Sequence, residues 1–314
     1  MNVGTAYGCA PRPHTYVLYH RDADGFASAF AAWCALGYAG VTYISVQYGE
    51  PLPAMADGSR VFIVDFNYKR TVLMDLCQRM REVVVLDHHK TAEEELRGLA
   101  CATFDMEKAG CQLAWDYFSN PAVISENAPA AELLAEPLPW LLAAVADRDL
   151  WKFALPATAE ISAALELRKW DFDLWRAMCD YDREAQDSFI LEGHTCIMHQ
   201  SMAVRRMANH KHPIGLRGEN GKTLVVIGCN AALWQSECAH YLLKSDCGPV
   251  VACYAMEEKG IRVSLRGDGT VDVSAIAKRY ESGGGHHNAA GFFYPTDPLT
   301  FTKGQPGPAE EVAP

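Results

Sequence analysis

The hydrophobic positions of the first half form short runs rich in β-branched residues, separated by longer segments with helical periodicity. The short runs cover residues 15–20, 41–48, 61–66, 83–86 and 101–104. They lack strict polar–apolar alternation, which is typical of strands buried on both faces of a parallel sheet. The helical segments cover residues 26–36, 69–80, 109–118 and 138–146. This alternation predicts a doubly wound α/β domain with a mainly parallel sheet.

The second half has a different pattern. Helices are predicted at 172–179 and 184–209, strands at 224–228, 250–256, 261–265 and 291–294, and further helices at 238–243 and 273–280. We therefore expect five segments: a flexible N-terminus (1–14), the α/β domain (15–155), a helical connector (156–212), a smaller C-terminal α/β domain (213–296) and a flexible tail (297–314).

Length and charge narrow the functional classes. The chain has 314 residues, which favours two domains, and its formal net charge is −11. An acidic chain does not offer the broad basic surface that long duplex DNA requires. A small phosphate substrate stays possible, because a metal ion supplies positive charge locally.

The cysteines and the N-terminus indicate a cytoplasmic protein. The eleven cysteines contain no CxxC pair, and Cys247 and Cys253 lack zinc-site spacing, so we interpret the cysteines as reduced, mostly buried thiols. Residues 1–13 show no apolar core of a signal peptide. The uncharged stretch 25–49 contains Gly, Ser and Gln among many alanines, which favours a buried helix and strand over a membrane span.

Acidic and histidine residues follow the predicted strands. They are His20, Asp22 and Asp24, then Asp65, then Asp87-His88-His89, and finally Asp147-Arg148-Asp149 at the end of an apolar helix. A single Asp there is usually a cap or turn residue, but the carboxyl edge of an open parallel sheet is also where ligands bind. Carboxylates and imidazoles gathered at one edge need a cation to offset their repulsion and burial. Oxygen and nitrogen ligands without thiolate favour Mn²⁺ or a related ion, and two such ions can clamp a phosphoryl group.

These motifs, in this order, resemble the DHH phosphoesterase superfamily, which is named for the triplet present here as Asp87-His88-His89. The resemblance covers residues 15–294 and implies a phosphoesterase with two Mn²⁺ ions, Mg²⁺ or Co²⁺ being alternatives. The implied metal ligands are His20, Asp22, Asp24, Asp65 as the bridge, His88 and Asp147. His89 would contact the substrate phosphate, Arg21 would help to neutralise it, and Asp87 would orient the site or bind metal.

Two positions depart from the pattern or have a rival. Many members have three residues between the first His and the Asp-x-Asp, whereas only Arg21 separates His20 from Asp22 here; nuclease-like branches share this tighter spacing. Asp149 is the rival of Asp147, and Asp147 is preferred because Trp151 follows it by four residues, where the family often has an aromatic residue.

A glycine cluster precedes the last predicted strand. Successive backbone N–H groups of Gly283, Gly284 and Gly285, with His286, could form an anion-binding concavity. The cluster resembles the glycine-rich motif of the DHH-associated C-terminal domain, which holds the part of a nucleotide distant from the cleaved phosphate. Arg266, at a predicted strand end, has a guanidinium suited to a phosphate.

The resemblance, the chain length and the charge together predict hydrolysis of short nucleotide substrates: short oligonucleotides, dinucleotides or a nucleoside bisphosphate. A single-strand-specific exonuclease is the first alternative, and a non-catalytic nucleotide-binding regulatory module is the second. We expect no long duplex DNA and no membrane as partners, and a homodimer stays open.

Overall fold

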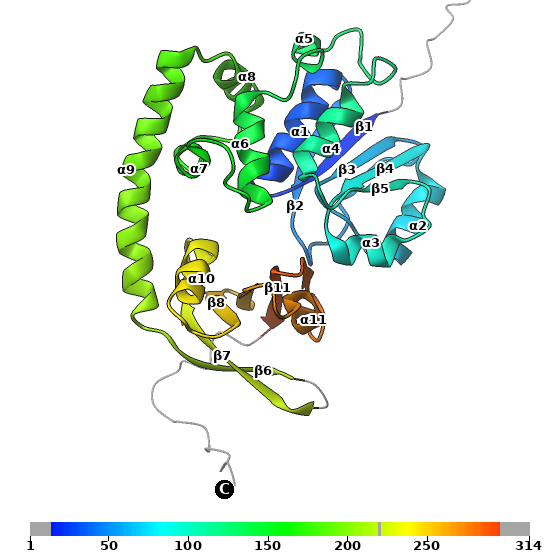
Figure 1. The fold of residues 1–314 in the computed structure, drawn as a ribbon. Coiled ribbons are helices and arrows are strands. Elements are labelled where there is room, and N and C mark those ends of the chain that lie inside the picture. The colour runs from blue at the N-terminus through cyan, green and yellow to red at the C-terminus, as the bar shows by residue number, and fades with distance from the viewer. Residues whose placement is uncertain (1–13, 219–220, 296–314) are drawn as a thin grey trace, which may run out of the picture. The chain divides into compact units, whose positions relative to one another are not determined.

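The computed structural model describes residues 14–218 and 221–295, which divide into two compact units (Figure 1). The boundary falls after Gln200, inside the long helix α9 (Arg183–Ala208). The expected flexible ends lie outside the described residues, apart from His14.

The first unit contains a parallel sheet of five strands. The strands are β1 (Thr15–His20), β2 (Val41–Val46), β3 (Arg60–Val64), β4 (Glu82–Asp87) and β5 (Ala102–Phe104). Their order is β2-β1-β3-β4-β5, and every neighbouring pair is parallel. The chain leaves β1 towards β2 on one side and returns to β3 on the other, so a switch point lies at the carboxyl ends of β1 and β3.

Helices cover both faces of this sheet, as the sequence predicts. On one face, Val17 and Phe62 pack with α1 (Ala23–Leu36), α4 (Gly110–Phe118) and α6 (Trp140–Asp149). On the other face, Leu18 and Ile63 pack with α2 (Arg70–Arg79) and α3 (Lys90–Leu96). Consecutive residues of a strand thus pack into the cores on opposite faces of the sheet. This explains why the strands contain continuous apolar runs instead of alternating apolar and polar residues. The short helix α5 (Ala131–Leu134) joins the first core.

Most of the expected helical connector belongs to the first unit. Helices α7 (Thr158–Leu165) and α8 (Phe172–Cys179) bury Ile161 and Trp175 in the same core as α1, and α9 adds Phe189. The sequence predicts helices here correctly at 172–179 and 184–209. It does not reveal which core their apolar faces join, because that depends on tertiary packing.

The second unit contains a mixed sheet of six strands. They are β6 (His212–Arg217), β7 (Thr223–Asn230), β8 (Val250–Glu257), β9 (Gly260–Gly267), β10 (Gly284–Gly285) and β11 (Ala289–Pro295), in the order β10-β11-β9-β8-β7-β6. Only β7 and β8 pair in parallel among these strands. β6 contains Pro213, which is compatible with the position of this strand at the edge of the sheet.

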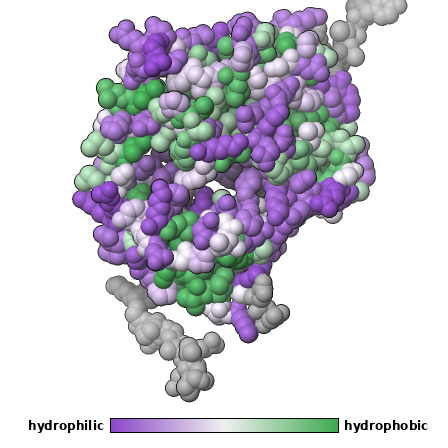
Figure 2. Space-filling model, viewed as in Figure 1, coloured by the Kyte–Doolittle hydropathy of each residue, from purple (hydrophilic) through white to green (hydrophobic). Residues whose placement is uncertain are grey.

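Each face of the second sheet carries its own core. One contains Val273 and Ile276 of α11 (Val273–Ala277), and the other contains Cys238 and Leu242 of α10 (Gln235–Lys244) with the last turns of α9. Figure 2 shows mostly hydrophilic side chains on the visible surface, interrupted by smaller apolar areas. Across the described residues, no helix combines the length and the apolar character that crossing a membrane requires.

Candidate metal and phosphate site

Six acidic and imidazole side chains gather where β1, β3 and β4 end and where α6 ends. We call them the carboxylate–histidine cluster: His20, Asp22, Asp24, Asp65, His88 and Asp149. The expected edge of the sheet therefore does bring together residues from four separate motifs.

The cluster consists of two groups that meet at Asp65. In the first group, Nδ1 of His20 lies 2.6 Å from Oδ2 of Asp22 and 3.8 Å from Oδ2 of Asp65. In the second group, Nε2 of His88 lies 3.2 Å from Oδ1 of Asp65 and 3.4 Å from Oδ2 of Asp149. Asp65 thus turns one carboxylate oxygen to each group, as a bridging ligand would.

Asp22 and Asp24 are positioned by the start of α1. Asp22 caps this helix, and its Oδ1 accepts a hydrogen bond from the Gly25 backbone N–H at 2.9 Å. A Cβ on Gly25 would lie 2.2 Å from the carbonyl oxygen of His20, so only glycine allows the helix to begin so close to β1. The short spacing between His20 and Asp22 is compatible with both side chains entering the cluster.

Asp24 and Asp65 are held by the start of α4. The carboxylate of Asp24 accepts hydrogen bonds from the backbone N–H groups of Gly110 at 2.6 Å and Cys111 at 3.0 Å, a favourable place for negative charge. A Cβ on Gly110 would lie 2.5 Å from Cβ of Asp65, so glycine is required there too. Asp65 itself has a left-handed backbone (φ 53°), a strained conformation that is common at functional sites.

The electrostatics of the cluster favour a bound cation. Burial, and then the neighbouring carboxylates of Asp24 and Asp22, raise the pKa of Asp65 well above its usual value. The same causes raise the pKa of Asp149. Burial lowers the pKa of His88, which keeps its imidazole in the neutral form that binds metals. A divalent ion would remove the repulsion between these carboxylates, so the residues fit the metal centre that the superfamily implies.

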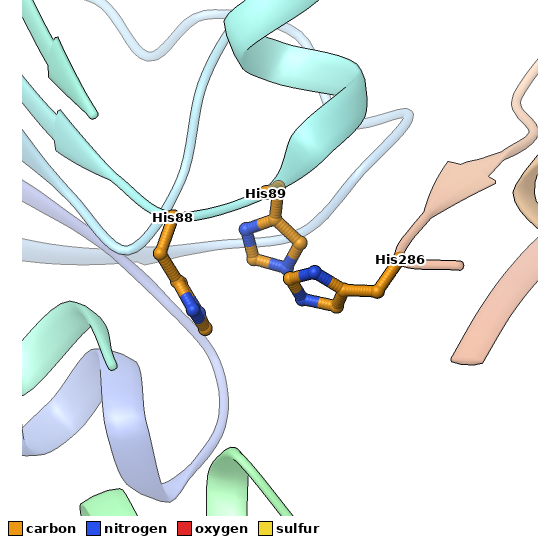
Figure 3. A group of neighbouring side chains, drawn as sticks. All are labelled: His88, His89 and His286. Atoms are coloured by element: carbon orange, nitrogen blue, oxygen red, sulfur yellow. The ribbon is translucent and has the colours of Figure 1, made fainter. Parts of the chain in front are cut away.

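His89 and Asp87 form a separate pair beside the cluster. Oδ1 of Asp87 lies 2.6 Å from Nδ1 of His89 and accepts hydrogen bonds from the backbone N–H groups of His88 and His89. Burial alone would lower the pKa of His89, but the carboxylates of Asp87, Asp149 and Asp22 together outweigh burial and raise the pKa to about 9. Figure 3 shows the imidazoles of His88 and His89 on the same side of the turn after β4, and their ring centroids lie 4.8 Å apart. The figure also draws His286 of the second unit. Asp87 therefore orients His89.

The preference for Asp147 over Asp149 is not supported by the geometry. Oδ1 of Asp147 accepts a hydrogen bond from the Ala154 N–H at 3.0 Å, and Oδ2 accepts from the Leu155 N–H at 3.1 Å and Thr158 Oγ1 at 2.5 Å. Asp147 thus ties the loop before α7 to α6. Residues two apart on a helix point in very different directions, so only Asp149 faces the cluster.

Arg21 was expected to help neutralise the substrate phosphate but is paired with Glu50, whereas Tyr48 was not expected near the site but lies beside two of its histidines. The guanidinium of Arg21 lies 3.2 Å from both carboxylate oxygens of Glu50 and is half-exposed, so its charge is already paired. Tyr48, which belongs to none of the sequence motifs, has its ring 5.5 Å from the ring of His20 and 6.0 Å from that of His89. In the sequence, its position two residues after the end of β2 is what could have indicated that Tyr48 lies near the site.

The glycine cluster of the second unit forms a hairpin rather than an open anion cradle. Gly284 and Gly285 form β10 and pair with β11, while the N–H of Gly283 donates to Tyr280 O and the N–H of His286 donates to Ala289 O. The backbone N–H of Gly283, one of the three expected to face an anion, is therefore used within the chain. A Cβ on Gly283 would lie 1.7 Å from a backbone oxygen, which explains the need for glycine there.

Arg266 is held rigidly on β9. Its Nη1 donates to Ser264 Oγ at 3.0 Å and to Leu265 O at 2.9 Å, and its Nη2 donates to Ser236 Oγ at 2.7 Å. These bonds fix the guanidinium in one orientation, as phosphate recognition requires.

Comparison with known proteins identifies both units. Residues 14–144 match the DHH family, N-terminal domain, and residues 235–299 match the DHHA1 domain. The chain belongs to the DHH superfamily. The predicted superfamily and its C-terminal domain are thus confirmed, and members of this superfamily are hydrolases that act on phosphoester bonds.

Similar proteins span nearly the whole chain. Uncharacterized protein R106 of Acanthamoeba polyphaga mimivirus is 28% identical over 299 residues, which are 88% of this chain and 67% of that protein. Among solved structures, RecJ from Thermus thermophilus in complex with Mn²⁺ is 16% identical, with a TM-score of 0.47 over 89% of this chain and 49% of that chain. The pGpG-specific phosphodiesterase of Vibrio cholerae is 9% identical, with a TM-score of 0.38 over 90% and 93% of the two chains.

Proposed function

We propose that this chain is a metal-dependent phosphoesterase that hydrolyses short oligonucleotides, dinucleotides or a nucleoside bisphosphate. The observation that carries the proposal is the position of Asp65, whose two carboxylate oxygens face two separate groups of ligand-type side chains. A carboxylate shared in this way is what a two-metal phosphoesterase needs.

The donor set supports two hard or borderline divalent ions. His20, Asp22 and Asp65 would hold one ion, and Asp24, His88 and Asp149 would hold the other together with Asp65. Carboxylate and imidazole ligands suit Mn²⁺, with Mg²⁺ and Co²⁺ as alternatives. When bound, such a pair supplies an activated water and stabilises negative charge on the phosphoryl group.

His89 is proposed to bind the substrate phosphate. Asp87 holds its Nδ1, which leaves the ring orientation fixed and the imidazole positively charged at neutral pH. A fixed cation of this kind stabilises the charge that develops on the phosphoryl oxygens. Arg21 is omitted from this role because Glu50 already neutralises it.

The second unit is proposed to bind another part of the nucleotide. Arg266 offers a fixed guanidinium, and His286 follows the glycine hairpin and offers a ring nitrogen. The net charge of −11 favours short substrates over long duplex DNA.

The test is a substrate panel with Mn²⁺. Metal-free full-length protein would receive Mn²⁺ and be offered di- to pentanucleotides, a cyclic dinucleotide, an adenosine bisphosphate, pyrophosphate and long single-stranded DNA. We expect turnover of one of the short nucleotides, absent with chelator and in the Asp65→Asn variant. Preferential digestion of long single strands would favour the exonuclease alternative. Binding without turnover of any phosphoester, with Mn²⁺, Mg²⁺ or Co²⁺, would overturn the proposal.

A further inference from the structure

Three cysteine side chains meet in one core of the second unit. We call Cys229, Cys238 and Cys253 the thiol cluster; all three are fully buried. Sγ of Cys229 lies 3.2 Å from Sγ of Cys238 and 3.9 Å from Sγ of Cys253, and all three sulfurs lie within 4.8 Å of one another.

Regular structure brings these thiols together. Cys229 and Cys253 are direct partners in the parallel pair β7–β8, so their side chains leave the same face of the sheet side by side. Cys238 comes from α10, which packs on that face. A site carried by two strands and a helix is held more precisely than a site on loops.

The sulfur spacing fits a thiolate-bound metal. A Zn–S bond of about 2.3 Å places thiolates roughly 3.8 Å apart around one tetrahedral ion. The 3.9 Å between Cys229 and Cys253 matches this spacing, whereas the 3.2 Å between Cys229 and Cys238 is shorter and would have to widen on binding. Buried cysteines also occur simply as small apolar groups, so the competing interpretation is a reduced, metal-free core.

A fourth sulfur lies at the edge of the same core. Cys247, in the turn after α10, packs against the core that contains the thiol cluster and is only partly buried. Its Sγ is not among the sulfurs that lie within 4.8 Å of one another, so its side chain would have to turn towards them to bind the same ion. Its Sγ lies 3.6 Å from the backbone oxygen of Ser245, a weak contact that a metal ligand would replace. Structural zinc sites almost always have four ligands.

We propose that Cys229, Cys238 and Cys253 bind a structural Zn²⁺ ion in the second unit, and that Cys247 turns towards them to become the fourth ligand. Binding replaces the protons of the thiols, which pass to the solvent, and involves no change of oxidation state. The sequence hides the site because these cysteines are nine, nine and six positions apart instead of forming CxxC pairs. The ion would join two strands, a helix and a turn, and so stabilise this unit.

Cobalt spectroscopy tests the site in the full-length protein. Reduced, metal-free protein would be titrated with Co²⁺, because Co²⁺ bound to thiolate absorbs in the near ultraviolet, whereas Co²⁺ on carboxylate and imidazole ligands does not. We expect such a band to saturate with one thiolate-bound Co²⁺ per chain and to disappear when Zn²⁺ is added. Absence of the band in the wild-type protein would overturn the proposal, and this result does not depend on any variant being able to fold.

Variants assign the ligands. Cys238→Ser should abolish the band, and Cys247→Ser should weaken it in proportion to the one lost thiolate. Cys77→Ser and Cys196→Ser are matched controls from the first unit and should leave it unchanged. A full band in Cys238→Ser, or its loss in either control, would show that the ion binds elsewhere.

Discussion

The two units each gather a cluster of potential ligands, but in opposite surroundings. In the carboxylate–histidine cluster, the side chains of Asp22 and Asp149 are 44% and 30% exposed. The residues of this cluster lie where β1, β3, β4 and α6 end. The thiols of Cys229, Cys238 and Cys253 are fully buried between a sheet and a helix. Catalytic metal sites keep a position open for substrate, whereas structural sites are closed. The comparison therefore favours the chemical role proposed for the first cluster and the stabilising role proposed for the second.

The largest effect should come from the residue that joins the two halves of the open site. Asp65→Asn removes the charge that both groups share, so we expect kcat to fall by about 10³-fold or more. The measurement is the rate of nucleotide hydrolysis at saturating Mn²⁺, with circular dichroism to verify the fold. A variant with near wild-type kcat would remove Asp65 from the site.

Asp149 and Asp147 provide a matched pair of substitutions. Asp149→Asn should lower kcat about 10²-fold with little loss of stability. Asp147→Asn should instead cost about 2 kcal/mol of unfolding free energy, because three donors lose their charged acceptor, while the folded variant keeps its kcat. Urea unfolding and hydrolysis rates would be measured on both. The reverse result would restore Asp147 as the ligand.

His89 separates substrate binding from metal binding. His89→Ala should lower kcat about 10²-fold and leave Mn²⁺ affinity unchanged, because the side chain is proposed to contact phosphate and no metal. Calorimetric Mn²⁺ titration beside the rate assay would check this. A large loss of Mn²⁺ affinity would make His89 a metal ligand.

The second unit should contribute a smaller effect on activity. Arg266→Ala is expected to raise KM about tenfold with little change in kcat, as for a group that binds substrate and transition state equally. Ser264→Ala, which removes one of the hydrogen bonds that fix Arg266, should raise KM less. Steady-state kinetics on both variants would measure KM and kcat. An unchanged KM in Arg266→Ala would show that Arg266 does not bind the substrate.

The smallest expected effect is the release of protons when Mn²⁺ binds to the carboxylate–histidine cluster. The raised pKa values of Asp65 and Asp149 mean that the metal-free protein retains protons that Mn²⁺ must displace. Mn²⁺ binding should therefore release protons and weaken as the pH falls. Calorimetry in two buffers of different ionisation enthalpy would measure the release, and equal heats in both buffers would contradict this account.

Sequence patterns predicted the first sheet well. Strand β1 matches the predicted range, and β4 ends at the Asp87 of the named triplet. Local periodicity is sufficient there because both faces of the sheet are buried. Helix α3 was missed because its exposed residues hide the two buried ones, Ala92 and Leu96.

The candidate site shows where sequence reasoning stops. The motifs locate the edge of the sheet, but the choice between Asp147 and Asp149 depends on helix rotation and on the loop that Asp147 binds. The thiol cluster depends on strand register and helix packing, so no short spacing reveals it. In both cases the decisive contacts are tertiary, and residues near in sequence separate while distant ones meet.

The central claim is that the carboxylate–histidine cluster supports metal-dependent hydrolysis of a short nucleotide. The most direct measurement is dinucleotide hydrolysis by metal-free wild-type protein as Mn²⁺ is added, with Asp149→Asn measured in parallel. The account predicts a rate that rises from zero to saturation in the wild type and stays about 10²-fold lower in the variant. Equal rates in the two proteins, or hydrolysis that persists with excess chelator, would contradict it.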